Sequence, residues 1–131
     1  MRLLLDTHIW IWIYTAPENL TSDVAKEMTN PNSERYVSPV SIWEIAVLLE
    51  KRRIDLRGDF GEWFKKSVKE LVLLEAPLNW NVAHELKFTM LSHRDPADRF
   101  LVATAKVFDL TLVTADEKLM SVPGMKVMPN R

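Results

Sequence analysis

The sequence predicts an α/β protein in which helices cover both faces of a central parallel sheet of four to five strands. Short apolar segments alternate with helical segments along the 131 residues, a rhythm that is typical of parallel sheets. The first apolar run, Leu3–Leu5, is continuous rather than alternating. Such a run suits a strand that is buried on both faces.

The other expected strands are equally short, and proline, glycine or asparagine lies near most of their ends. The predicted strands are Leu3–Leu5, Tyr36–Val37, Leu71–Leu74, Thr111–Thr114 and Met125–Met128.

The predicted helices begin at residues that are typical of helix starts. Thr21 and Ser38 suit the N-cap position, and Pro39 and Pro96 suit the first helical turn. Aromatic and aliphatic residues at helical spacing follow Phe60. The helices are expected at residues 9–14, from Thr21, at 38–52, at 60–71, from Asn79 or Asn81 to Met90, and at 95–107.

Composition sets aside several classes of protein. The chain is 47% hydrophobic and 27% charged with a net charge of −1, which predicts one globular domain and gives no overall signal for nucleic acid. It has no cysteine, which excludes thiol chemistry, and only three glycines, without a phosphate-binding glycine motif. With no signal peptide and no long apolar stretch, we expect a cytoplasmic protein without a membrane span.

Acidic residues recur where the predicted elements meet. Asp6 and Asp116 each follow a strand, and Glu44 lies early in the helix after the second strand. Strand ends and the starts of the following helices share one edge of such a sheet, so these side chains should converge. Asp95 and Asp98 begin a helix after a long loop and are placed there less directly. Converging carboxylates repel one another unless a hard cation such as Mg²⁺ or Mn²⁺ binds them.

All of these acids except Asp6 also have a simpler structural interpretation, and for Glu44 it is a charge near the start of its helix. Asp95 can be a helix cap, Asp98 a first-turn charge or a partner of a nearby arginine, and Asp116 a turn residue. Several other polar residues near the predicted site have hydroxyl, imidazole or guanidinium groups without metal-ligand spacing: Thr7, Thr114, His8, His93, Arg94 and Arg99. The five tryptophans suggest core or interface aromatics.

Four segments together resemble the PIN-domain family, and within it the VapC-type toxins of toxin–antitoxin pairs. They are LLLDTHIWIW, VSPVSIWEIAV, HRDPADRFLVATA and TLVTAD, in this order along the chain. The resemblance covers nearly all of residues 1–131 and implies a single PIN-like α/β/α sandwich, with Leu3–Leu5 as the central strand. It also implies a Mg²⁺- or Mn²⁺-dependent, single-strand-selective endoribonuclease, a homodimer and a cognate antitoxin.

The resemblance assigns the family's four acids to Asp6, Glu44, Asp98 and Asp116, with Asp95 as an additional candidate. Thr114 matches the hydroxyl residue that usually precedes the last acid. Two positions depart from the pattern: Leu48 stands where relatives often have lysine, and Ala97 where they often have an aromatic residue.

The resulting hypothesis is a Mg²⁺-dependent endoribonuclease toxin that hydrolyses structured RNA such as tRNA, rRNA or mRNA. Asp6 and Asp98 are the expected direct metal ligands, and Glu44 and Asp116 complete the site directly or through water. The alternatives are a PIN nuclease of RNA processing or decay, a Mg²⁺-binding receiver-like signalling module and a non-catalytic interaction module. A receiver-like module should carry a phosphoacceptor aspartate on the third strand, where this chain has Glu75.

Overall fold

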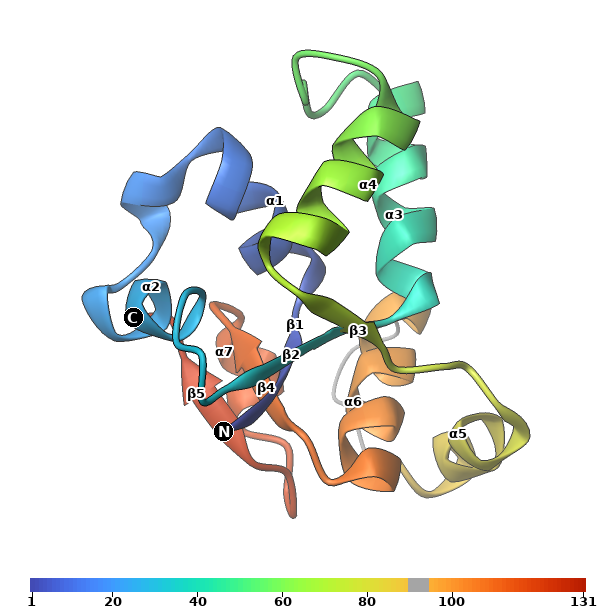
Figure 1. The fold of residues 1–131 in the computed structure, drawn as a ribbon. Helices are drawn as coiled ribbons and strands as arrows, with labels where there is room; N and C mark the ends of the chain where they lie inside the picture. Colours follow the sequence, from blue (N-terminus) through green and yellow to red (C-terminus); the bar gives the residue numbers. More distant parts are fainter. Residues whose placement is uncertain (90–94) are drawn as a thin grey trace.

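The computed structural model describes residues 1–89 and 95–131 and contains one five-stranded sheet (Figure 1). All neighbouring strands are parallel, in the order β3-β2-β1-β4-β5. The predicted α/β architecture with a central parallel sheet is therefore confirmed. The strands are β1 (Arg2–Leu5), β2 (Glu34–Val37), β3 (Leu73–Glu75), β4 (Thr111–Thr114) and β5 (Val127–Pro129).

β1 is the central strand, as its sequence predicted. Leu4 pairs with Tyr36 of β2 on one side and with Leu112 of β4 on the other. Leu3, Leu4 and Leu5 are 0% exposed. A strand enclosed on both faces and both edges has no polar side to present, which is why its sequence does not alternate.

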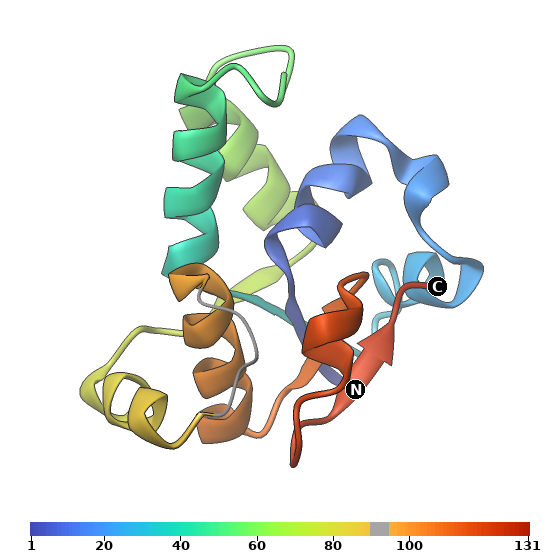
Figure 2. The same ribbon diagram turned by 180° about the vertical axis from the view of Figure 1, so that it is seen from behind.

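Helices form one layer on each face of the sheet (Figures 1 and 2). Leu3 and Leu5 pack into a core with the first four helices, whereas Leu4 packs into a second core with α6 and α7. The helices are α1 (Thr7–Thr15), α2 (Ser22–Glu27), α3 (Pro39–Glu50), α4 (Phe60–Glu70), α5 (Trp80–Glu85), α6 (Pro96–Phe108) and α7 (Glu117–Met120), with 3₁₀ turns at Pro17–Asn19 and Leu86–Phe88. None of the described helices is long and apolar enough to cross a membrane.

The capping chemistry predicted from the sequence is present. Thr21 Oγ1 accepts a hydrogen bond from the Val24 amide, and Ser38 Oγ accepts one from the Val40 amide. Of the two asparagines considered for α5, Asn79 is the cap. These bonds satisfy amides that have no partner within the first helical turn.

Several element boundaries were predicted wrongly. α1 begins at Thr7, directly after Asp6, and not at residue 9. The third strand begins at Leu73, because Leu71 ends α4 and Val72 has a positive φ of 51° that no strand residue adopts. The last strand begins at Val127, after a turn at Gly124 with φ 74°.

Another such boundary concerns α5, which ends at Glu85 and passes into a 3₁₀ turn, whereas a helix was expected to continue to residue 90. Met90 itself lies outside the described residues. The strand order also argues against the receiver-like alternative, because receiver domains have the order 2-1-3-4-5.

Candidate active site

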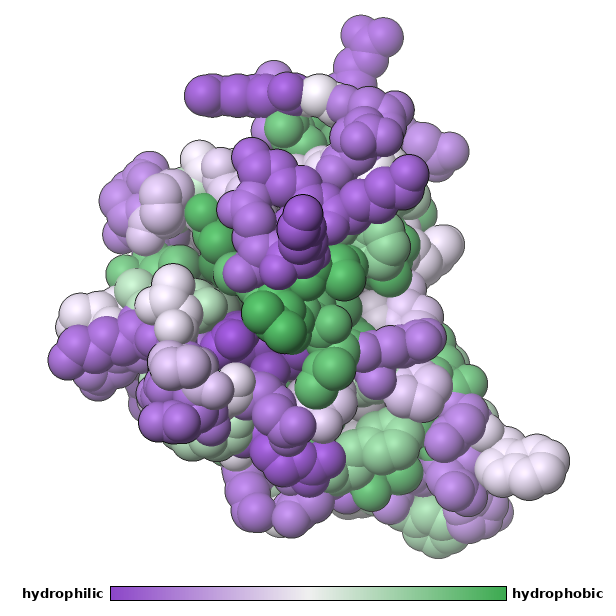
Figure 3. Space-filling view, in the orientation of Figure 1, coloured by the Kyte–Doolittle hydropathy of each residue, from purple (hydrophilic) through white to green (hydrophobic). Residues whose placement is uncertain are grey.

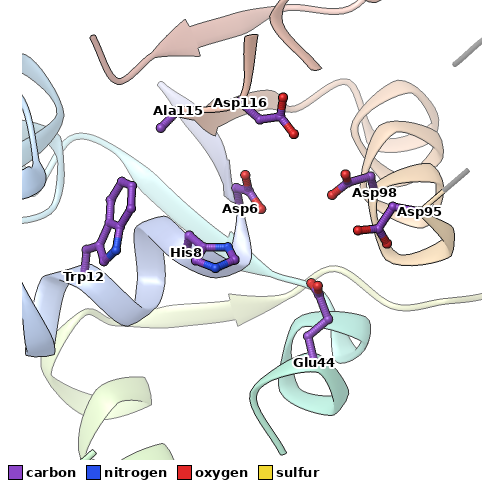
Figure 4. A pocket seen from close by; sticks show the side chains of 8 residues that line it. All are labelled: Asp6, His8, Trp12, Glu44, Asp95, Asp98, Ala115 and Asp116. Atoms are coloured by element: carbon purple, nitrogen blue, oxygen red, sulfur yellow. The ribbon is translucent and has the colours of Figure 1, made fainter. Parts of the chain in front are cut away.

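A pocket of about 310 Å³ opens at the carboxyl ends of β1 and β4 (Figure 4). All five acids singled out in the sequence line it, including Asp95 and Asp98, whose placement was less certain. The lining residues are Asp6, His8, Trp12, Glu44, Asp95, Asp98, Ala115 and Asp116.

Asp6 is the most enclosed of these carboxylates. Its backbone amide continues the sheet by donating to the Val113 carbonyl (3.0 Å), which fixes the residue at the end of β1. Its side chain is 8% exposed, and Oδ2 accepts a hydrogen bond from Thr114 Oγ1 (2.7 Å). Burial raises the pKa of Asp6 to about 6 and Asp98 adds repulsion, against the opposing effects of Thr114 and His8.

Glu44 reaches the pocket from the second turn of α3. Its carboxylate accepts a hydrogen bond from the hydroxyl of Thr7, which also bonds Ser41 Oγ (2.8 Å). Thr7 thereby connects the start of α1 to α3. The pKa of Glu44 is raised, chiefly by burial and further by the charges of Asp6, Asp95 and Asp98, although the Thr7 bond opposes this.

Asp95 and Asp98 enter the pocket from the first turn of α6, on the side opposite α1 (Figure 4). Asp95 is the N-cap, and its Oδ1 accepts a hydrogen bond from the Ala97 amide (3.0 Å). The capping interpretation of Asp95 is therefore confirmed, yet the residue also lines the pocket. The two interpretations offered by the sequence do not exclude each other.

Asp116 follows β4 and caps α7, where its Oδ1 accepts a hydrogen bond from the Lys118 amide (2.9 Å). Its own amide donates to Thr114 Oγ1 (3.0 Å). The Thr114 hydroxyl thus accepts from Asp116 and donates to Asp6, so that one fully buried side chain sets the positions of two pocket residues.

Sequence reasoning did not assign the two aromatic lining residues a place in the site. His8 was left without a role, and Trp12 was grouped with the core or interface tryptophans. They are four residues apart on α1, so helical spacing could have indicated that they share one face. His93 and Arg94, two of the polar residues near the predicted site, lie outside the described residues. Arg99 is not among the lining residues, and its guanidinium donates to the Leu86 carbonyl (3.3 Å).

The carboxylates that line the pocket suit a hard divalent cation. Within residues 1–89 and 95–131, no three acidic or histidine side chains lie together as a ready chelate. Mg²⁺ commonly keeps several waters and uses only one or two protein carboxylates. A buried carboxylate with a raised pKa, such as Asp6, is stabilised by a nearby cation because the cation favours the ionised form. The pocket therefore fits Mg²⁺ or Mn²⁺ and does not fit a closed zinc-type site.

A family model for the PIN domain matches residues 3–125. The chain belongs to the PIN-domain family. Ribonuclease VapC22 of Mycobacterium tuberculosis is 31% identical to this PIN domain over 122 residues, covering 91% of this chain and 90% of its own. The resemblance to VapC-type proteins is thus confirmed.

Solved structures show the same PIN fold. A chain of VapBC2 from Rickettsia felis, solved with a DNA fragment of the VapBC2 promoter, aligns with a TM-score of 0.75 and 15% identity over 98% of both chains. A toxin–antitoxin complex from Klebsiella pneumoniae aligns with a TM-score of 0.65 and 18% identity, again over 98% of both chains. At these identities the likeness concerns the fold alone.

Proposed function

We propose that this PIN domain is an endoribonuclease that depends on Mg²⁺, with Mn²⁺ as a substitute, and hydrolyses phosphodiester bonds in structured RNA. The observation that carries the proposal is the convergence of five carboxylates on one pocket at the strand ends. The similarity to Ribonuclease VapC22 supports the same activity.

Asp6 and Asp98 would hold the ion directly, and Glu44 and Asp116 would complete the site directly or through water, with Asp95 beside them. A bound divalent ion would lower the pKa of a water that serves as the nucleophile. It would also supply positive charge that stabilises the phosphoryl oxygens. Thr114 keeps the Asp6 carboxylate oriented, and Thr7 does the same for Glu44. In-line attack by water would leave a 5′-phosphate and a 3′-hydroxyl.

The proposal includes the role of a toxin with a cognate antitoxin. It is supported by the likeness to VapC22 and to chains solved in VapBC complexes. An apolar groove of about 250 Å³ on the α3, α4 and β3 side offers a place for an antitoxin segment. It is lined by Val37, Pro39, Ile42, Phe64, Val68, Leu73, Leu74 and Glu75. Figure 3 shows hydrophobic side chains gathered on that face over β3 and the adjacent end of α4.

A homodimer is part of the same proposal. A second apolar hollow lies beside the acidic pocket and includes the exposed side chains of Trp43 and Leu78 together with Phe100. Exposed apolar surface of this kind is a common feature of protein interfaces. We propose that this PIN domain acts in the cytoplasm.

The test is RNA cleavage by the wild type and by Asp6→Ala, each with Mg²⁺ and with EDTA. We expect cleavage only by the wild type with Mg²⁺. Asp23→Ala, which removes an exposed carboxylate on α2 far from the lining residues, is the matched control and should cut normally. Cleavage that persists in Asp6→Ala or in EDTA would overturn the metal-site model.

A further inference from the structure

We propose that Trp12, with His8 beside it, is a stacking surface for an unpaired base of the RNA substrate, next to the phosphate at the carboxylates. The inference rests on the proposed ribonuclease function and adds a substrate contact to it. It starts from the α1 side of the pocket, which is formed by aromatic rather than acidic side chains.

His8 and Trp12 lie one helical turn apart on α1 and therefore share a face. Their ring centroids are 6.1 Å apart, and the planes meet at 62°. In Figure 4 the His8 ring lies beside Asp6, and the Trp12 indole lies farther out on the side away from Asp95 and Asp98. The lining of the pocket therefore extends from the carboxylates past an imidazole to an indole.

The two tryptophans of α1 have different surroundings. Trp10 is 0% exposed, packs against Trp63 with ring centroids 5.0 Å apart and donates from Nε1 to Ser67 Oγ (2.5 Å). Trp12 is only partly buried, packing against the same core on one side while lining the pocket. Trp10 completes the core between α1 and α4, whereas Trp12 leaves part of a large aromatic ring in contact with any ligand in the pocket.

The charge of the pocket makes an aromatic contact especially useful. Its lining contains five carboxylates and, among the described residues, no lysine or arginine. A phosphate away from the metal would meet repulsion there, but stacking between a base and an indole does not depend on charge. Base–aromatic stacking contributes about 1–3 kcal/mol per base and tolerates any sequence, because every base has a π-face. It also requires an unpaired base, which would restrict cleavage to single-stranded segments.

The experiment uses stopped-flow indole fluorescence with a single-stranded oligoadenylate and a base-free ribose-phosphate chain of equal length. Oligoadenylate should quench the wild type before cleavage begins, and the base-free chain should not. Trp12→Leu should lose the quench, and its KM for RNA should rise by about 5- to 150-fold with little change in kcat, as expected from the loss of one stacked base.

Trp12→Phe should retain most of the affinity for RNA, since it keeps an aromatic face. This variant also tests whether the loss in Trp12→Leu is caused by misfolding. Trp80→Leu is the matched control: it removes a tryptophan that is 86% exposed on α5, outside the pocket, and should keep the wild-type quench and KM. A Trp12→Leu protein with wild-type quench and KM would overturn the stacking proposal while leaving the ribonuclease intact. A wild type that neither cuts nor binds RNA would overturn the proposed function and the stacking with it.

Discussion

Asp6, Asp95 and Asp116 occupy the same position relative to a helix but have different bonding. Each stands at an N-cap, before α1, α6 and α7 respectively. Asp95 and Asp116 accept hydrogen bonds from amides of the helix that follows. Asp6 makes no such capping bond; it accepts from Thr114 across the sheet and is buried.

This difference separates stability from function within one pocket. A capping carboxylate stabilises its helix whether or not a ligand is present. A buried carboxylate with a raised pKa destabilises the metal-free protein when it ionises, and a cation reverses that effect. Asp6 is therefore the carboxylate whose burial the proposed metal ion would offset most directly.

The largest expected effect compares Asp6→Asn with Asp95→Asn in RNA cleavage. Asp6→Asn should lower the rate by about 10³-fold, because a misplaced metal forfeits several kcal/mol of transition-state stabilisation. Asp95→Asn should lose less than about tenfold, because asparagine caps a helix as well as aspartate does. Single-turnover cleavage rates with Mg²⁺ measure the effect of both substitutions. Equal losses of rate would contradict the different roles assigned to the two aspartates.

The next effect is on stability as pH changes without metal. Because the folded pKa of Asp6 is about 6, above its unfolded value of about 4, the folded state binds more protons between these values. The free energy of unfolding should therefore fall as pH rises from about 4 to 7, by up to about 3 kcal/mol from this group. Glu44, whose pKa is also raised, contributes in the same direction.

Urea unfolding in EDTA measures this effect, with Asp6→Asn as the reference. We subtract the free energy of unfolding of Asp6→Asn from that of the wild type. This difference should shift against the wild type as pH rises. In parallel, Mg²⁺ affinity should increase as pH rises through about 6, since the ion competes with a proton. A difference that does not change with pH would show that the pKa of Asp6 is the same in the folded and unfolded states.

A smaller effect is expected at the hydroxyl that joins two of the acids. Thr114→Val removes the donor to Asp6 and the acceptor for the Asp116 amide with little change in volume. The pKa of Asp6 should rise further, the protein should lose about 1–2 kcal/mol of stability, and cleavage should fall by about tenfold. The pH–rate profile should shift its acidic limb to higher pH, and Thr114→Ser should restore the wild-type profile.

The smallest expected effect is the loss of a cap. Asp95→Ala should lower the free energy of unfolding by about 1 kcal/mol, and Asp95→Asn should not, because only alanine lacks a side-chain acceptor for the Ala97 amide. Thermal unfolding of the two variants checks this. If both are as stable as the wild type, Asp95 does not stabilise α6.

The elements that hold the acids could be predicted because local chemistry determines them. Leu3–Leu5 has the continuous apolar pattern of a central strand, and Ser38-Pro39 and Asp95-Pro96 have the chemistry of helix starts. Parallel strand ends share an edge, so Asp6 and Asp116 were expected together, and both line the pocket. Which of the acids bind metal stays a prediction.

The contacts that distinguish the acids could not be predicted, because they join residues far apart in the chain. The Thr7–Glu44 bond spans 37 positions and the Thr114–Asp6 bond spans 108. The positive φ of Val72, which displaced the third strand, contradicts the preference of a β-branched residue. Trp10 and Trp12 are the same residue type in similar sequence, and only the tertiary packing assigns one to the core and the other to the pocket.

The most direct test of the central claim is Mn²⁺ or Mg²⁺ binding measured by calorimetry at pH 7.5, without RNA. The wild type should show saturable binding, Asp95→Asn should bind within about tenfold of it, and Asp6→Asn should bind at least about 100-fold more weakly. Binding to Asp6→Asn with wild-type affinity would contradict the assignment of Asp6 as the carboxylate on which the metal site depends.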